Sequence, residues 1–166
     1  LAGEGSGSVT DHKVQIFADA FIPTDEAMTL WGISKPVLAG VNDFRKPRRL
    51  GEALPRLFKS HGDVYLLRSP HDHQPGEPSL AARITEPRSG RVLEVYTDES
   101  CLQFYTAVSL DGSETGKSGR TYQPHAGLCL ECQGYANGTQ TAEFGDILVR
   151  PGQAQRHQTR YAFSTC

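Results

Sequence analysis

The residue whose setting most clearly indicates chemistry is Glu131, the one charged residue in the run 127–133. This run alternates as a half-buried strand does, and successive side chains of a strand point to opposite faces. One face then carries Cys129, Glu131 and Gln133, and the other carries Leu128, Leu130 and Cys132. Burying an unpaired carboxylate is costly, so Glu131 is expected to face solvent, a partner or a ligand cleft.

A second polar pair, Gln103 and Tyr105, shares one face of another expected strand, 102–108. An amide exchanges hydrogen bonds with hydroxyl groups, and a phenol adds a ring that packs on apolar surface. Together they suit the hydroxyls and apolar faces of a sugar. The two strands therefore predict a cleft on a β-sheet with a carbohydrate as its ligand.

Other titratable residues are weaker candidates. Asp63, His61, His125 and His157 are each more typical of a loop or a strand end than of a catalytic position. His71 and His73 have a spacing that can bind a metal, but they lie in a polar, proline-rich loop (69–78) without a third ligand nearby. A solvated pair is the favoured interpretation.

Cys129 and Cys132 have the C-x2-C spacing of a zinc knuckle or a redox pair. Residues three apart in a strand point to opposite faces, and thiolates so placed cannot chelate one ion. We therefore expect ordinary thiols and no metal site. With only 4 cysteines in 166 residues, the chain does not resemble a secreted disulfide scaffold, and a reducing cytoplasm is favoured.

The elements that must position these side chains are strands. Glycine (17) and proline (10) punctuate short runs with period-two alternation, as in β proteins. The expected strands are 13–18, 64–67, 80–84, 91–97, 102–108, 127–133, 146–150 and 159–164, with an antiparallel hairpin between 91–97 and 102–108. The one helical pattern, 48–60, is limited to a turn or two by Pro55. The pattern predicts an all-β antiparallel β-sandwich in a single domain, residues 1–166.

Composition excludes two classes of partner. Lys plus Arg total 17 against 19 for Asp plus Glu, a net charge of -2, which argues against an extended nucleic-acid surface. The basic cluster 45–49 is short and broken by a proline, as a solvated loop is. No apolar run approaches the roughly 18 residues of a membrane span, and residues 1–8 lack the charged and apolar regions of a signal peptide.

Several motifs in one order resemble the aldose 1-epimerase (galactose mutarotase) family, specifically its C-terminal half. The strand Leu130-Glu131-Cys132-Gln133 resembles the family's L-E-x-Q motif. The other matching segments are 18–26, 43–47, 89–97, 102–106, 125–129, 148–152 and 157–164.

The resemblance implies a large antiparallel β-sandwich that interconverts the α and β anomers of hexoses such as galactose and glucose, without metal or nucleotide cofactor. In this family a carboxylate removes the proton of the anomeric hydroxyl while a histidine protonates the ring oxygen. By motif, Glu131 is the base and Gln103 a sugar-contacting amide; Tyr105, on the same face, is expected to contact the sugar. Asp63 is the nearest candidate for a sugar-binding aspartate, although the surrounding residues depart from the family pattern.

The general-acid histidine of the family lies in an N-H-S-Y-F-N-L motif, and Leu1-Ala2-Gly3 resembles the residues that follow it. The resemblance therefore implies a chain without the family's N-terminal portion and without its acid. Two functions stay open: a cytoplasmic aldose 1-epimerase, or a relative that binds a carbohydrate or a protein without catalysis. A half sandwich also exposes sheet edges, so self-association or docking on a partner chain is expected.

Overall fold

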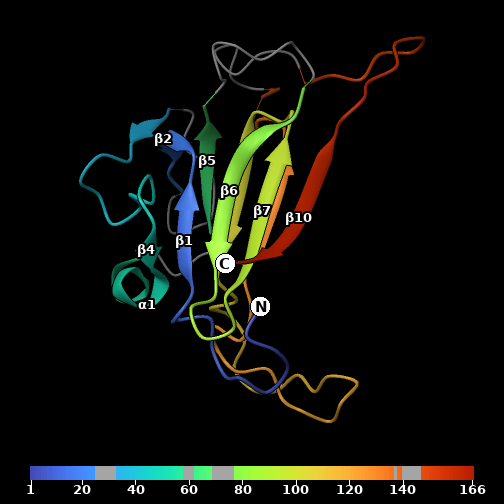
Figure 1. Cartoon of the computed structure of the whole chain (residues 1–166). Coiled ribbons are helices and arrows are strands. Elements are labelled where there is room, and N and C mark those ends of the chain that lie inside the picture. The colour runs from blue at the N-terminus through green and yellow to red at the C-terminus, as the bar shows by residue number, and fades with distance from the viewer. Residues whose placement is uncertain (25–32, 58–61, 69–76, 137, 140–146) are drawn as a thin grey trace.

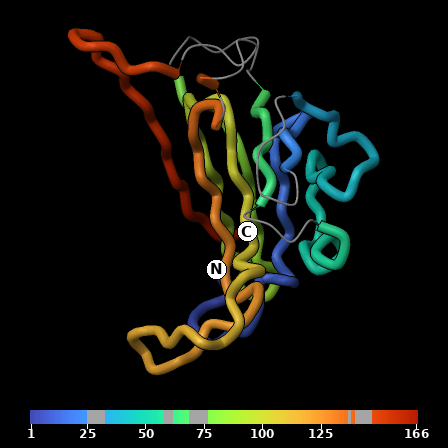
Figure 2. The backbone as a smooth tube through the Cα atoms, turned by 180° about the vertical axis from the view of Figure 1, so that it is seen from behind, coloured from blue at the N-terminus to red at the C-terminus, as the bar shows by residue number. Residues whose placement is uncertain are grey.

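The computed structural model describes residues 1–24, 33–57, 62–68, 77–136, 138–139 and 147–166, and in them two five-stranded antiparallel sheets dominate. Figures 1 and 2 show the two sheets as layers, seen from the front and from behind. The first sheet has the order β10 (Thr159–Thr165), β7 (Arg91–Thr97), β6 (Ser79–Thr85), β1 (Lys13–Ile16) and β4 (Arg48–Arg49). The second has the order β3 (Lys35–Pro36), β2 (Ala18–Ile22), β5 (Asp63–Leu67), β8 (Cys101–Tyr105) and β9 (Cys129–Gln133). The all-β sandwich is confirmed.

The hydrophobic core lies between the two sheets. The first sheet contributes the buried side chains Val14, Ile16, Ile84 and Val95; the second contributes Tyr65, Leu102, Phe104 and Leu130. The rings of Phe44 and Phe104 meet edge to face, with centroids 5.6 Å apart. Two of these side chains, Leu102 and Phe104, come from β8, so the inner face of this strand belongs to the core.

Helical structure is short where the sequence predicts it. Helix α1 (Leu50–Ala53) continues directly into the 3-10 turn η1 (Leu54–Arg56), in which Pro55 lies. Leu50 and Ala53 are the residues that this segment buries. No helix among the described residues is long and apolar enough to cross a membrane.

The expected hairpin between 91–97 and 102–108 is wrong. Strand β7 lies between β6 and β10, whereas β8 lies between β5 and β9, in the other sheet. The connection between β7 and β8, residues 98–100, crosses from one sheet to the other because its two ends are hydrogen-bonded to different sheets. The Asp98 amide donates to the Gln158 carbonyl, next to β10, and the Ser100 carbonyl accepts from Leu67 of β5.

Several strand boundaries also differ from the prediction. The expected strand 13–18 is divided between β1 (Lys13–Ile16) and β2 (Ala18–Ile22), which lie in different sheets, and the expected strand 127–133 begins at Cys129. Strand β8 ends at Tyr105, and Ala107 adopts a φ of 51°, a left-handed conformation that cannot continue a strand. Residues 147–150 form no strand, and residue 146 lies outside the described residues.

One side of the sandwich is open in the described part of the chain. Strand β9 is the last strand of its sheet, and β10 is the last of the other. Tyr161 and Phe163 of β10 stand opposite Val95 and Leu93, yet 50% and 71% of their surfaces are exposed. This side presents apolar side chains that a packed sandwich would cover.

Candidate functional site

Four neighbouring strands place one residue each in a row across the outer face of the second sheet. Ile22 of β2 stands opposite Val64 of β5, Val64 opposite Gln103 of β8, and Gln103 opposite Glu131 of β9. We call these four residues the cross-strand row. Directly opposite residues of antiparallel strands have Cβ atoms about 4.5–5.5 Å apart, so the amide and the carboxylate are neighbours.

The cross-strand row is apolar at one end and polar at the other. Ile22 and Val64 are buried and pack with Cys101, whereas Gln103 is half-buried and Glu131 is exposed. Glu131 makes no ion pair with any described residue. Its carboxylate already interacts with the Cys129 thiol, but it has no described cationic partner and remains exposed to a ligand that lies against Gln103.

Tyr105 lies on the same face, as predicted. It stands opposite Cys129, two positions further along the two strands. Its hydroxyl is hydrogen-bonded to the Ser109 hydroxyl and also accepts a hydrogen bond from the Ser109 amide at 3.3 Å. These bonds fix the phenol beside the row, so that the ring rather than a free hydroxyl is offered to a ligand.

Two described neighbours of Glu131 are a thiol and a phenol. Burial, and then the nearby Glu131 carboxylate, raise the pKa of the Cys129 thiol. The hydroxyl of Tyr161 on β10 donates to the Leu130 carbonyl at 3.4 Å, and burial raises the pKa of this phenol. Neither the thiol nor the phenol is a cation, so neither forms an ion pair with Glu131 that would compete with a ligand. Tyr161 is a neighbour that the sequence does not reveal, because β10 and β9 belong to different sheets.

Asp63 lies apart from the cross-strand row. It stands opposite Phe104, on the face of the sheet that carries the core. There its carboxylate accepts a hydrogen bond of 2.6 Å from the side-chain amide of Asn42. The backbone carbonyl of Asn42 accepts one of 3.0 Å from the Tyr65 hydroxyl. Burial raises the pKa of Asp63 to about 6, against the opposing effect of the Asn42 hydrogen bond. The structure brings Gln103, Tyr105 and Glu131 together without Asp63.

The residue before Asp63 is a glycine, Gly62, so it adds no side chain to the cross-strand row. Gly62 has a φ of 101°, and a Cβ atom on it would lie 2.2 Å from the Phe104 carbonyl oxygen. Backbone approach to β8 therefore fills the space beside Tyr105.

Two of the described histidines, His125 and His157, are bound to groups other than Glu131. The Nδ1 atom of His125 is 3.0 Å from the Thr106 carbonyl, and His157 pairs with Glu99 at 2.7 Å. His12 is buried, its Nδ1 atom has no hydrogen-bond partner among the described residues, and burial lowers its pKa. His61, His71 and His73 lie outside the described residues. The described part of the site thus holds a carboxylate and an amide without a neighbouring imidazole.

The cysteine pair has the geometry that the strand pattern predicts. Cys129 stands opposite Tyr105 and Cys132 opposite Leu102, so the two thiols point to opposite faces of β9. Within the described ranges, no three histidine, cysteine or acidic side chains are grouped closely enough to hold a metal ion.

Known proteins resemble the chain along almost its whole length. The family model of aldose 1-epimerase matches residues 1–162. A galactose mutarotase from Rattus norvegicus is 40% identical over 99% of the chain, and an aldose 1-epimerase from Escherichia coli is 29% identical over 98%. Among solved structures, a GalM/aldose epimerase homologue from C. elegans superposes with a TM-score of 0.86 at 24% identity, covering 98% of this chain and 48% of its own. The chain spans about half the length of these relatives, 47% for both of the sequences.

Proposed function

Because this chain belongs to the aldose 1-epimerase family, we propose that its cross-strand row is the base side of a site that interconverts the anomers of a hexose. The observation that carries the proposal is the direct pairing of Gln103 with Glu131 on the outer face of the sheet. In the proposed site Glu131 removes the proton of the anomeric hydroxyl, and Gln103 binds a neighbouring hydroxyl. The ring of Tyr105 lies against an apolar face of the sugar.

The chemistry balances with one acid and one base. As the base takes the hydroxyl proton, the C1–ring oxygen bond breaks, C1 becomes a carbonyl, and the acid protonates the ring oxygen. Rotation about C1–C2 and reclosure with the protons returned give the other anomer. Proton transfer requires each group within hydrogen-bond reach, and an exposed carboxylate on an open face meets that requirement from one side.

The acid is the group that the described residues do not supply next to Glu131, since His125 and His157 are bound to other partners. We infer that these 166 residues alone accelerate the reaction slowly at most. This observation also favours a second candidate, a carbohydrate-binding relative that keeps the amide and the carboxylate without catalysis. Four free cysteines support a reducing, cytoplasmic location for either function.

Polarimetry on freshly dissolved α-D-galactose tests the first function, and titration with galactose followed by calorimetry tests the second. The informative variants are Glu131→Gln and Gln103→Ala. Glu114→Gln is the matched control, because Glu114 is an exposed carboxylate remote in sequence from the cross-strand row.

An acceleration that Glu131→Gln abolishes and Glu114→Gln keeps supports the enzyme. Saturable binding without acceleration, weakened by Gln103→Ala, supports the binding module. If galactose neither binds nor mutarotates faster than in buffer, both functions are wrong for this chain.

A further inference from the structure

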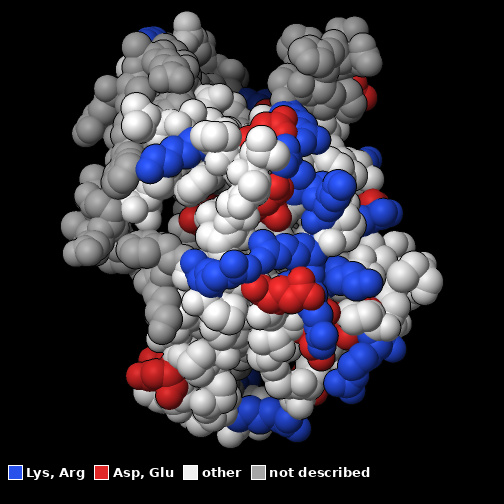
Figure 3. Space-filling view, turned by 90° about the vertical axis from the view of Figure 1, so that its left-hand side faces the viewer, with Lys and Arg blue, Asp and Glu red and all other residues white. Residues whose placement is uncertain are grey.

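A basic pocket lies outside the cross-strand row, beside α1. It has a volume of about 910 Å³ and is bounded by the loop 38–48, the α1–η1 segment and the end of β5. Figure 3 shows this side of the molecule, where Lys and Arg side chains gather in a band with acidic side chains among them. Its cationic lining residues are Arg45, Lys46, Arg48, Arg56 and Arg68.

Two of these cations are already neutralised. The Arg45 guanidinium donates two hydrogen bonds, of 2.9 and 2.8 Å, to the Asp43 carboxylate, and holds the pKa of Asp43 at about 2. Arg68 donates in the same forked manner to Asp19, at 2.7 and 2.5 Å. Arg45 and Arg68 therefore form a charge-balanced wall of the pocket.

The other three cations are not balanced. Lys46 and Arg56 are exposed and make no hydrogen bond or ion pair with any described residue. Arg48 is half-buried, with its guanidinium held by the Val41 carbonyl at 2.9 Å and lying 5.8 Å from the centre of the Phe44 ring. Against these three charges the lining offers one further carboxylate, that of Glu52.

We propose that this pocket binds a phosphate monoester, the phosphate group of a small metabolite, through Lys46, Arg48 and Arg56. An excess of two positive charges matches the dianion that a phosphate monoester carries near neutral pH. A guanidinium already fixed by a carbonyl and a ring loses little freedom on binding, which favours phosphate recognition by Arg48. A concave pocket in a chain of net charge -2 fits a compact anion better than a polynucleotide, which needs an extended basic surface.

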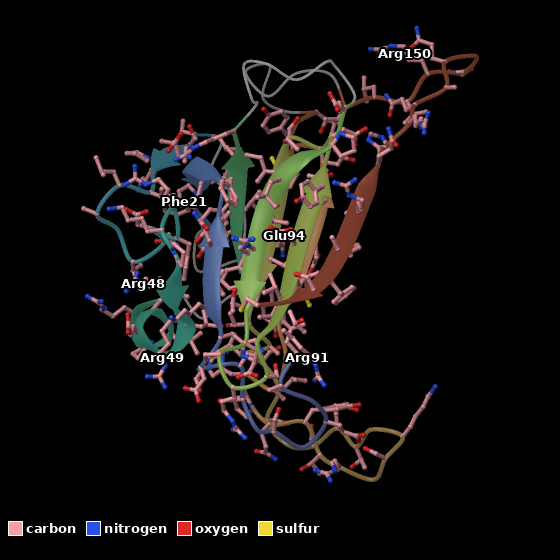
Figure 4. All side chains as sticks on the ribbon, viewed as in Figure 1. Phe21, Arg48, Arg49, Arg91, Glu94 and Arg150 are labelled. Atoms are coloured by element: carbon pink, nitrogen blue, oxygen red, sulfur yellow. The ribbon has the colours of Figure 1, made fainter. Side chains whose placement is uncertain are left out.

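Arg49 provides a matched control. It is the neighbour of Arg48 in β4, but it does not line the pocket, and it is paired with Asp11. Both arginines lie beside α1 in Figure 4. The substitutions Lys46→Gln, Arg56→Gln and Arg49→Gln each remove one positive charge from an exposed side chain, so they change net charge equally and leave the core intact.

The test is calorimetric titration of the 166-residue chain with inorganic phosphate, with galactose 1-phosphate and with galactose. We expect saturable binding of the two phosphates at one site, weakened about tenfold by Lys46→Gln or Arg56→Gln and little changed by Arg49→Gln. If galactose 1-phosphate binds more tightly than inorganic phosphate, the ligand is the phosphate group of a metabolite. Equal affinities identify inorganic phosphate as the ligand. Binding that survives Glu131→Gln separates this pocket from the proposed epimerase site.

Three results would overturn the proposal. The first is the absence of saturable phosphate binding. The second is an equal loss in all three charge variants, which indicates a general charge effect. The third is a single-stranded oligonucleotide that binds more tightly than either phosphate and depends on the same residues, which would make the surface a nucleic-acid site.

Discussion

Replacing Asp63 by asparagine should stabilise this protein at neutral pH and leave its stability unchanged in acid. The Asp63 carboxyl lies on the core side of β5, with a pKa raised to about 6 from an ordinary value of 3.8. Below pH 3.8 it is protonated in both the folded and the unfolded state. Between pH 3.8 and about 6 the folded state binds the proton that the unfolded state has lost, so the free energy of unfolding falls as pH rises through this window.

The magnitude follows from the shift. A difference of about two pKa units at 1.36 kcal/mol each gives a penalty of about 3 kcal/mol above pH 6. Asparagine has nearly the shape of the protonated carboxyl and no charge to bury. Its carbonyl can still accept the hydrogen bond that Asn42 donates. The Asp63→Asn chain should therefore be more stable by up to about 3 kcal/mol at pH 7.5 and by little at pH 3.5.

Urea unfolding of both chains at half-unit steps between pH 3.5 and 7.5 measures this difference directly, because all other titrating groups cancel. Asp43→Asn is the control of opposite sign. Arg45 lowers the pKa of Asp43 to about 2, so its carboxylate stabilises the fold above pH 3.8 and loses that contribution as pH falls toward 2. An Asp63→Asn difference that is flat with pH, or that destabilises the chain at pH 7.5, refutes the burial of this carboxyl.

Three further outcomes are expected. Gly62→Ala should lower the free energy of unfolding by about 2 kcal/mol or more, because a Cβ there meets the Phe104 carbonyl oxygen at 2.2 Å with φ at 101°; unchanged urea unfolding contradicts this approach of β5 to β8. Leu102→Ala should cost about 2–5 kcal/mol by the same measurement, because Leu102 is fully buried at the centre of the sandwich. Phe163→Ser should reduce self-association in light scattering and change the free energy of unfolding by less than about 0.5 kcal/mol, since 71% of this side chain is exposed. An unsubstituted chain that stays monomeric at high concentration argues against association through this open side of the sandwich.

Alternation along single strands was sufficient to predict the faces of the site. Residues 129–133 and 102–105 follow the period of two without a break, so the shared faces of Glu131 with Cys129, and of Gln103 with Tyr105, could be deduced from the chain.

Strand partners could not be deduced in the same way, because alternation determines a face and carries no information on which strand lies alongside. The segments 91–97 and 102–105 are close in sequence and both typical of strands, yet the tether of Asp98 to Gln158 places them in different sheets. The face on which Asp63 lies could not be deduced for a related reason. It begins its strand, where a shift of one residue decides between the ligand face and the core, and Asn42, its partner, lies in a loop with no periodic signal.

The position of β9 at the margin of its sheet determines where a partner for Glu131 can come from. Alternate amides and carbonyls of β9 point outward along that margin, and any strand that joins them must follow the 4.7–4.9 Å spacing of a β-sheet. Its residue opposite Glu131 would lie on the far side of the carboxylate from Gln103, within reach of the same ligand. A proton donor can therefore be supplied in trans, by a peptide designed as the next strand. Faster mutarotation on adding such a peptide would support the proposed epimerase site and show that sheet extension supplies its acid.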